Sequence, residues 1–285
     1  MRLKTLGILA LALVALAVPA VAQTFTFTAI PDADESRLRE RFNKVADYLT
    51  EKLGVTVKYV PVKNYAASVT AFRNNQVQMA WFGGLSGVRA RLLVPGSEAI
   101  AQGQEDTAFV TYFIAHSSTG LKPGDAFPEG IRGRTFTFGS KGSTSGRLMP
   151  EFYVRKHLGP PEQVFRRVGF SGDHSRTLAL VQSGAYEMGA LNYQVWEVEK
   201  KQGKVDPAKV AVIWKTPPYP DYQWTIRGDV DRRFGAGFKE KVKATLLGIE
   251  RKDILEAFPR SRFVPASNGD YQAILDTGKA IGILD

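Results

Sequence analysis

The feature that most constrains the fold of this chain is a regular alternation of short β-rich segments with longer amphipathic ones. Leu38, Phe42, Val45 and Leu49 recur at helical spacing, and Gly54 follows where a helix commonly ends. The expected helices are 35–53, 65–74, 145–157 and 174–183, and the expected strands are 24–30, 55–60, 77–82, 108–115, 135–138, 163–167, 186–191 and 210–214. This order predicts an α/β protein whose mixed sheets are flanked by helices.

An internal similarity indicates two related lobes. Sliding the sequence by 109 positions lays Tyr65 on His174 and Met79 on Met188, so that a polar-headed helix followed by an apolar strand occurs twice. The general likeness of any two such units explains the match equally well. With two lobes facing each other, the helices that begin at Tyr65 and His174 are expected to point their N-termini into the cleft.

The first 22 residues read as an export signal. Arg2 and Lys4 precede an uncharged apolar run over 6–18, and Ala20-Val21-Ala22 supplies a small-x-small cleavage site. An uncleaved anchor helix is the alternative, but Pro19 interrupts the run where a membrane span would continue. We expect a signal peptide over 1–22, cleaved near Ala22, and a soluble protein exported to the periplasm.

Composition narrows the function classes. The 285 residues include 38 Lys and Arg against 28 Asp and Glu, a formal net charge of +10, and no Cys. The basic residues are dispersed and form no stripe interleaved with aromatic residues, so we expect no nucleic-acid binding, while a mild attraction for small anions is compatible. The absence of Cys excludes disulfides, thiolate metal sites and cysteine catalysis.

No constellation in the sequence indicates catalysis. No two His share a metal-ligand spacing, and no Gly-x-Ser-x-Gly nucleophile elbow occurs. The sequence therefore predicts no catalytic residues, no metal and no cofactor. A secreted phosphoryl-transfer hydrolase, which would need a metal cluster or an activated nucleophile, is the competing class.

The strongest chemical signal is the loop 139–146, with the sequence Gly-Ser-Lys-Gly-Ser-Thr-Ser-Gly, between an expected strand and an expected helix. A helix N-terminus offers unpaired N–H groups and a positive dipole end, and Ser143, Thr144 and Ser145 add hydroxyl donors there. Ordinary N-capping, which needs a single hydroxyl, is the alternative. The Walker spacing is absent, so the loop indicates a site for a small oxyanion and not for nucleotide hydrolysis.

Three further places carry candidate ligand contacts. His174 opens a helix after a glycine turn, where a ring nitrogen could donate to a bound oxygen. The stretch 217–224, Pro-Pro-Tyr-Pro-Asp-Tyr-Gln-Trp, holds Asp221 and Tyr222 among rigid prolines, which also suit a stiff connection between lobes. Phe82 ends an aromatic strand before two glycines that allow a ligand close to the backbone.

At these residues the chain resembles the phosphate, phosphite and phosphonate substrate-binding proteins of ABC transporters. The motifs that match are Asn64-Tyr65-Ala66-Ala67, Met79-Ala80-Trp81-Phe82-Gly83, Ser143-Thr144-Ser145-Gly146, Ser171-Gly172-Asp173-His174 and Gly189-Ala190-Leu191-Asn192. The resemblance implies a two-lobed periplasmic-binding-protein fold of type II, with the ligand in the cleft between the lobes. It assigns 23–112 to the first lobe, 113–216 to the second, and 217–285 to a return segment in the first.

The resemblance also implies the site and the partners. Ser143, Thr144 and Ser145 would hold the anion, Tyr65 and His174 would donate from opposite lobes, and Phe82 stands where relatives often carry Tyr, so one hydroxyl is missing there. The protein would be a monomer that delivers its ligand to an inner-membrane permease with its ATPase. A sensor presenting the ligand to a signalling receptor would use the same site.

Ligand choice is expected to depend on Gln194 and Asp221. Gln194 stands where aminoalkylphosphonate binders place a Glu, and a neutral amide loses that ion pair, so these ligands are disfavoured. The stretch that holds Asp221 and Tyr222 resembles the branch assigned to phosphite or to selenate. An ionised Asp221 accepts hydrogen bonds only, which favours phosphite or phosphate, which carry an acidic proton, over selenate and sulfate.

Overall fold

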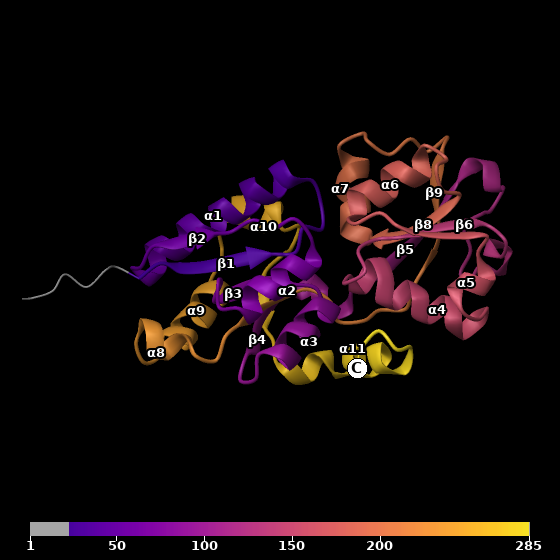
Figure 1. The fold of residues 1–285 in the computed structure, drawn as a ribbon. Helices are drawn as coiled ribbons and strands as arrows, with labels where there is room; N and C mark the ends of the chain where they lie inside the picture. The colour runs from indigo at the N-terminus through magenta and orange to yellow at the C-terminus, as the bar shows by residue number, and fades with distance from the viewer. Residues whose placement is uncertain (1–22, 285) are drawn as a thin grey trace, which may run out of the picture.

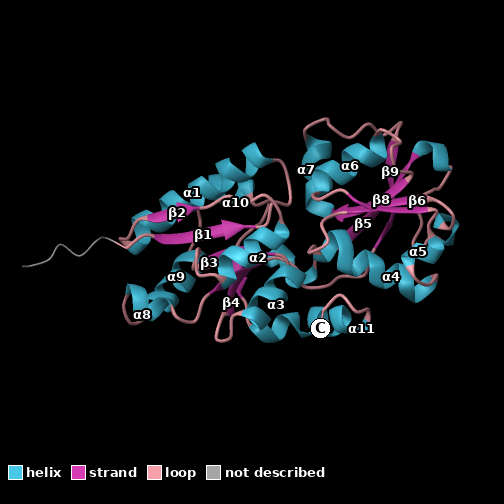
Figure 2. Cartoon of the chain, viewed as in Figure 1, coloured by secondary structure: helices cyan, strands magenta, loops and turns pink. Residues whose placement is uncertain are grey.

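The computed structural model describes residues 23–284, so the expected signal peptide lies outside the described residues. Two sheets, each covered by helices, form two lobes side by side (Figure 1). The first sheet has the order β11-β4-β10-β3-β1-β2 and the second the order β7-β6-β8-β5-β9. The expected α/β architecture of mixed, helix-flanked sheets is confirmed (Figure 2).

The first sheet contains strands from both ends of the chain. Its strands are β1 (Phe25–Ala29), β2 (Val57–Tyr59), β3 (Met79–Phe82), β4 (Glu98–Gly103), β10 (Gln223–Ile226) and β11 (Phe263–Pro265). The helices that belong to it are α1 (Glu35–Leu53), α2 (Tyr65–Arg73), α3 (Gly84–Leu93), α8 (Val230–Phe234), α9 (Phe238–Leu247), α10 (Lys252–Ala257) and α11 (Gln272–Ala280). Short 3-10 turns are η1 (Gln104–Ala108) and η5 (Asn268–Tyr271).

The second sheet is built from the middle of the chain. Its strands are β5 (Thr111–His116), β6 (Thr135–Phe138), β7 (Arg167–Phe170), β8 (Met188–Asn192) and β9 (Val210–Lys215). Around it lie α4 (Met149–His157), α5 (Pro161–Val164), α6 (His174–Gln182) and α7 (Tyr193–Lys201), the turns η2 (Ser117–Thr119) and η3 (Glu129–Ile131), and the π-helical turn η4 (Thr144–Leu148). No helix within 23–284 is long and apolar enough to cross a membrane.

Helix α1 shows how local sequence sets the element bounds. The Asp34 side chain accepts hydrogen bonds from the backbone N–H groups of Ser36, at 3.0 Å, and Arg37, at 3.3 Å, and so caps the start of the helix. Gly54 ends it in the left-handed conformation, with φ 73°. Both bounds agree with the helix expected from the apolar period.

The internal similarity is confirmed in three dimensions. Helices α2 and α6 have 9 residues each and begin at Tyr65 and His174, the two positions that the 109-residue shift superposes. Asn64 and Asp173 cap them in the same way, each accepting a hydrogen bond from the backbone N–H three residues later, at 2.8 and 2.7 Å. Each lobe therefore presents one of these helix N-termini beside the other lobe.

The expected helix over 145–157 is present, but its beginning is wider than an α-helix. In η4, the N–H of Leu148 donates to the carbonyl of Ser143 at 3.0 Å, five residues back, and α4 begins only at Met149. Pro150, near the start of α4, has no N–H to donate. An N–H at position 150 would bond the carbonyl of Gly146 in an α-helix, or that of Ser145 in a π-helical turn. Both carbonyl groups are therefore free for other donors.

These carbonyl groups find partners outside the helix. The carbonyl of Ser145 accepts a hydrogen bond from the Thr111 hydroxyl at 2.9 Å, and that of Gly146 accepts one from the N–H of Gly139 at 2.7 Å. The two bonds anchor the turn to β5 and to the end of β6. The hydroxyl residues of the turn are thus fixed beside the inner strands β5 and β6 of the second sheet.

The strand expected over 163–167 is wrong. Pro160 and Pro161 start the short helix α5, since proline at the first helical position fixes φ at a helical value and lacks an N–H that would go unused there. Strand β7 begins only at Arg167 and pairs in parallel with β6. Val164, at the end of α5, and Phe165, in the turn that follows, are both buried.

The lobes touch each other along the cleft. The N–H of His174 donates to the carbonyl of Asp32 at 3.1 Å, and the N–H of Leu85 donates to the Thr144 hydroxyl at 3.0 Å. Arg37 on α1 forms an ion pair with Glu199 on α7 at 3.1 Å. Helix α11 packs against both α3 and η4 and lies beneath the junction of the lobes in Figure 1.

The chain passes between the two sheets in two segments that pair with each other. The N–H of Phe109 donates to the carbonyl of Tyr219 at 2.8 Å, and the N–H of Tyr219 donates back to the carbonyl of Phe109 at 2.9 Å. The N–H of Asp221 also donates to the carbonyl of Asp106 at 3.0 Å. The connections therefore form a short antiparallel ribbon that carries Asp221 to the cleft.

Candidate oxyanion site

The candidate site lies where the carboxyl ends of parallel strands from both sheets meet. Residues after β1 and β3 approach it from the first lobe, and residues after β6 and β8 approach it from the second. Most of the side chains predicted for the site are nearly inaccessible to solvent: Tyr65 and Ser143 are 2% exposed, Thr144, Ser145, Asp221 and Tyr222 1%, and His174 0%. Several helix N-termini converge on this enclosed region, an arrangement that favours negative charge.

The three consecutive hydroxyl residues of η4 have different roles. The Ser143 hydroxyl caps the turn by accepting from the N–H of Gly146 at 2.9 Å. The Thr144 hydroxyl accepts from the N–H of Leu85, in the first turn of α3, at 3.0 Å. The Ser145 hydroxyl lies 3.5 Å from Nε2 of His174. The run thus serves as cap and as lobe-to-lobe contact, and its first N–H groups have no partner within the turn itself.

His174 is held as a neutral hydrogen-bond donor. Its Nδ1 accepts a hydrogen bond from the N–H of Asn192 at 3.2 Å, so the neutral ring carries its proton on Nε2, toward Ser145. Burial lowers the pKa of His174 to about 4, against the opposing effect of the Asp32 charge. At neutral pH the ring therefore offers one N–H donor without adding a positive charge.

The Asp221 carboxyl group has one bonded and one unbonded oxygen. Oδ1 accepts a hydrogen bond from the N–H of Gly84, at the start of α3, at 2.8 Å. Oδ2 is buried and has no partner among the described residues. Burial raises the pKa of Asp221 to about 7, partly opposed by the nearby Thr144 hydroxyl and by the hydrogen bond from the Gly84 N–H. The group therefore titrates near neutrality and has one oxygen free to bond a ligand.

Two tyrosines line the same region. The Tyr65 hydroxyl is buried and unbonded in the part of the chain that the structure covers, and its ring lies beside Gly142. The Tyr222 hydroxyl accepts a hydrogen bond from the Asn192 side chain at 2.9 Å, and its ring stacks on Trp81 with centroids 5.6 Å apart. Burial raises the pKa of both hydroxyls well above 10, so both remain protonated donors.

Phe82 and Gln194 are placed differently from the other predicted residues. The Phe82 ring packs edge-on against Phe72 of α2, with centroids 5.7 Å apart, in the core of the first lobe. The Gln194 amide donates to the carbonyl of Pro259 at 3.2 Å, across the lobe boundary. Gln194 lines a separate cavity of about 700 Å³ together with Pro259 and Arg260. Their roles as ligand contacts stay predictions.

Three contributors to the region were missed from the sequence. Asp32 is 4% exposed, and its Oδ1 has no partner within 23–284. Asn192 bonds two residues of the region: its backbone N–H donates to Nδ1 of His174, and its side-chain amide donates to the Tyr222 hydroxyl. The N–H groups of Gly84 and Leu85 are bonded by side chains of the cleft. Gly83 and Gly84 were the one sequence feature that marked the start of α3. Nothing in the sequence distinguished Asp32 from the capping residue Asp34.

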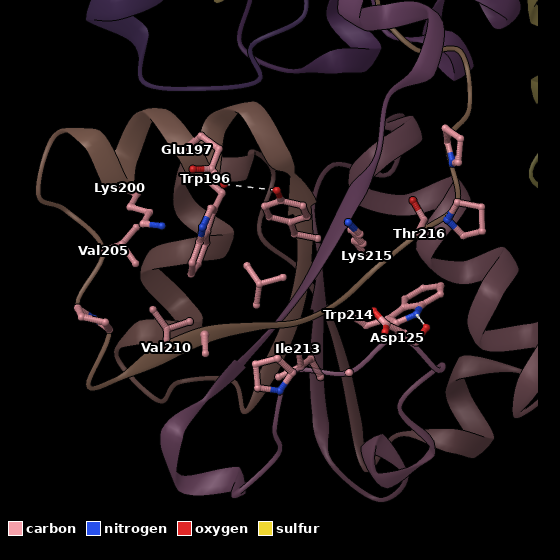
Figure 3. Close-up of a pocket in the computed structure, with 18 residues that line it drawn as sticks. Asp125, Trp196, Glu197, Lys200, Val205, Val210, Ile213, Trp214, Lys215 and Thr216 are labelled. Atoms are coloured by element: carbon pink, nitrogen blue, oxygen red, sulfur yellow. Dashed lines mark hydrogen bonds between the residues drawn. The ribbon is translucent and has the colours of Figure 1, made fainter.

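The largest cavity described here lies away from the enclosed site. A cavity of about 1050 Å³ lies on the second lobe, along β9 and α7, and is lined by Tyr112, Trp196 and Trp214 (Figure 3). A smaller one of about 480 Å³ lies between the lobes beside the candidate site, and it is lined by Tyr65 from the first lobe and by Ser140 and Gly142 from the second. No group of three or more His, Asp or Glu that could hold a metal ion occurs among the described residues.

Comparison with known proteins shows the family. Residues 27–271 match a family model described as "ABC transporter, phosphonate, periplasmic substrate-binding protein". The chain is 40% identical over 262 residues to a probable ABC transporter phosphite binding protein, PhnD1, of Prochlorococcus marinus strain MIT 9301, covering 89% of this chain and 88% of that protein. It is 25% identical to the phosphonates-binding periplasmic protein of Escherichia coli strain K12, over 70% of this chain and 59% of the relative.

A solved structure agrees with these sequence matches. PhnD1 from Prochlorococcus marinus in complex with methylphosphonate superposes with a TM-score of 0.87 at 40% identity, covering 91% of this chain and 98% of that one. A binding-protein component of a phosphonate transporter from Pseudomonas aeruginosa gives 0.78 at 20% identity, over 89% and 85% of the two chains, and shows the shared fold. The two-lobed type II fold expected from the sequence is confirmed.

Proposed function

The chain belongs to the family of periplasmic phosphonate-binding proteins of ABC transporters, and from this premise we propose that it captures a small phosphorus oxyanion, phosphite before phosphate or small phosphonates, in the periplasm. It acts as a monomer that delivers the anion to a membrane permease and its ATPase. The lobes 23–112 with 217–285, and 113–216, close on the ligand, and the protein performs no chemistry on it. The same region of the cleft would serve a periplasmic sensor.

The observation that carries the choice of ligand is the unbonded Oδ2 of Asp221. An acceptor buried among helix N-termini and hydroxyl groups is matched by an anion that brings its own acidic proton. Phosphite and phosphate monoanions carry such a proton near neutral pH, whereas sulfate and selenate do not. The pKa of Asp221, raised to about 7 by burial, makes the carboxyl group a shared-proton partner in this pH range.

The remaining contacts follow from the donors around that oxygen. Ser143, Thr144, Ser145 and the N–H groups of their turn take the anionic oxygens, and Tyr65 and the Nε2–H of His174 donate from opposite lobes. Tyr222 positions Asn192, and Phe82 supplies an apolar wall. Gln194, with a neutral amide bonded to Pro259, offers no carboxylate for a ligand ammonium group, so aminoalkylphosphonates bind poorly.

One relative supports the phosphorus oxyanions in two ways. PhnD1 of Prochlorococcus marinus is named a probable phosphite binding protein, and its solved structure holds methylphosphonate. A site with side chains that are 2% exposed or less suits ligands of this size better than long-chain phosphonates.

The test is calorimetric titration of protein stripped of ligand by unfolding and refolding, with phosphite, phosphate, methylphosphonate, sulfate and selenate at pH 7. We expect phosphite to bind tightest and Asp221→Asn to weaken it by about ten- to a hundredfold, as loss of a charge-assisted buried bond does. The gap between phosphite and sulfate should narrow in the variant. Asp125→Asn removes an exposed carboxylate and is the matched control. Tight selenate binding, or unchanged discrimination in Asp221→Asn, would overturn the proposed ligand.

A further inference from the structure

A second carboxyl group, that of Asp32, lies at the cleft. Asp32 follows β1 and is 4% exposed. Its backbone carbonyl accepts the N–H of His174 at 3.1 Å, so the residue is at the contact between the lobes. Its side-chain Oδ1 is buried without a hydrogen-bond partner in the described part of the chain, as are Oδ2 of Asp221 and the hydroxyl of Tyr65. Buried polar groups are rarely left unbonded without a reason.

The side chains that respond to the charge of Asp32 are those of the proposed site. After burial, this charge is the next cause that raises the pKa of Tyr65 and of Tyr222, and it is the one charge that opposes the lowering of the pKa of His174 by burial. These residues come from α2, from the segment before β10 and from α6. The Asp32 carboxylate therefore lies close to all three side chains.

A structural role beside Arg41 is the competing explanation. Arg41 is 8% exposed and lies near Asp32, whose charge raises the pKa of the guanidinium against the effect of burial. However, Arg41 Nε also has no partner among residues 23–284, and the guanidinium lies over the rings of Phe42 and Phe258, at 5.8 and 5.3 Å. No hydrogen bond joins Nε to Oδ1 of Asp32, so Arg41 leaves that oxygen unsatisfied.

We propose that Asp32 is a second carboxylate of the oxyanion site, and that it selects anions which carry an acidic hydroxyl group by accepting a hydrogen bond from it. This role rests on the proposed function. The phosphate monoanion has two hydroxyl groups and can bond Asp32 and Asp221 together, whereas the phosphite and methylphosphonate monoanions have one, which the two carboxyl groups share. Hypophosphite has the same central atom and charge as the phosphite monoanion but no hydroxyl group, so it leaves the oxygen unbonded and in repulsion with the anion.

The experiment compares phosphite and hypophosphite by calorimetry at pH 7 on the wild-type protein, Asp32→Asn and Asp34→Asn. Asp34 is the matched control, because it is in the same turn, carries the same charge and is exposed, and an amide oxygen can still cap α1. We expect Asp32→Asn to lower the ratio of phosphite to hypophosphite affinity by about tenfold or more, and Asp34→Asn to leave it unchanged. Circular dichroism checks the folding of each variant, and Asp32→Ser replaces Asp32→Asn if the latter does not fold.

Each other outcome overturns something specific. If Asp32→Asn weakens both anions equally, Asp32 acts through the fold or the lobe contact, and its role in recognition is wrong. If the fall in ratio disappears when Arg41→Met is the background, Asp32 serves to balance Arg41, and the proposal is likewise overturned. If the wild-type protein binds neither anion, the proposed function itself fails, and the role of Asp32 fails with it.

Discussion

At the scale of single residues, two opposing effects act on the ionised form of Asp221. Its burial raises the energy of the ionised form, while the N–H of Gly84 bonds one of its oxygens. A carboxyl group whose folded-state pKa is about 7 holds its proton where an unfolded chain, with a value near 3.8, has released it. The residue therefore destabilises the ligand-free fold at neutral pH, a cost that a ligand proton can offset.

The sign of this effect gives a stability prediction. Between about pH 4 and 7 the folded protein binds more protons at Asp221 than the unfolded chain, so its free energy of unfolding falls as pH rises, at up to about 1.4 kcal/mol per unit. Asp221→Asn removes this dependence. We would measure urea unfolding of the ligand-free protein at pH 4.5, 6 and 8. The free energy of unfolding of the variant should rise relative to that of the wild type by a few kcal/mol over this range, with no further rise above pH 8. Parallel stability curves would contradict the raised pKa; Asp125→Asn is the control.

At the scale of elements, the start of α3 is the point where both lobes and the interlobe ribbon meet. Gly83 precedes the helix in extended conformation, with φ −77°, so alanine is allowed there by the backbone. A Cβ on Gly83 would lie 3.0 Å from Oδ1 of Asp221 and 3.3 Å from the Thr144 hydroxyl. A methyl group would thus push apart two of the side chains that α3 holds together.

We accordingly expect Gly83→Ala to weaken phosphite binding by about tenfold, with a change in melting temperature of only a few degrees, because the site is displaced but the core is not. Calorimetry and thermal unfolding measure the two effects. Gly124→Ala is the matched control, since a Cβ there meets nothing within 4 Å. An unchanged affinity in Gly83→Ala would mean that the start of α3 is not part of the site.

The elements also show how far sequence reasoning reaches. Helix α1 was predictable end to end, since its apolar period, its Asp34 cap and its Gly54 stop agree. The π-helical turn η4, which precedes α4, was not predictable. It depends on Pro150 together with donors from Gly139 and Thr111, which are distant in sequence or belong to another strand. The elements β4, α3, α7 and all those from β10 onward went unpredicted.

The same limit applies to the site. Hydroxyl residues at a helix start and a histidine after a glycine turn carry a local signal, so Ser143, Ser145 and His174 were found, and the structure brings Ser145 and His174 to 3.5 Å. Asp32 carries none, since its importance comes from burial by the second lobe. The interlobe bond of Gln194 to Pro259 is equally invisible in one sequence.

At the scale of the whole molecule, the Arg37–Glu199 ion pair ties the lobes together at one side of the cleft. The side chains are 19% and 5% exposed, and Glu199 also accepts a hydrogen bond from Ser175 on α6. Because the pair links α1 of the first lobe to α7 of the second, we expect it to slow the separation of the lobes.

Arg37→Gln should therefore speed the release of phosphite by about three- to tenfold without changing the preference for phosphite over sulfate, because neither side chain of the pair is among the predicted ligand contacts. Stopped-flow fluorescence of the native tryptophans measures release. Arg39→Gln, which breaks an exposed pair with Glu35 inside α1, is the control. A changed preference in Arg37→Gln would show that the pair acts on the site itself.

The ribbon formed by the two interlobe segments has a mechanical consequence. Because Phe109 and Tyr219 hydrogen bond to each other in both directions, neither connection can bend without the other. We therefore expect the lobes to open mainly by one coupled bending motion, so that labels placed at different points across the cleft report the same rate constant. An empty molecule then has to bend this ribbon as well as break the contacts between the lobes each time it opens.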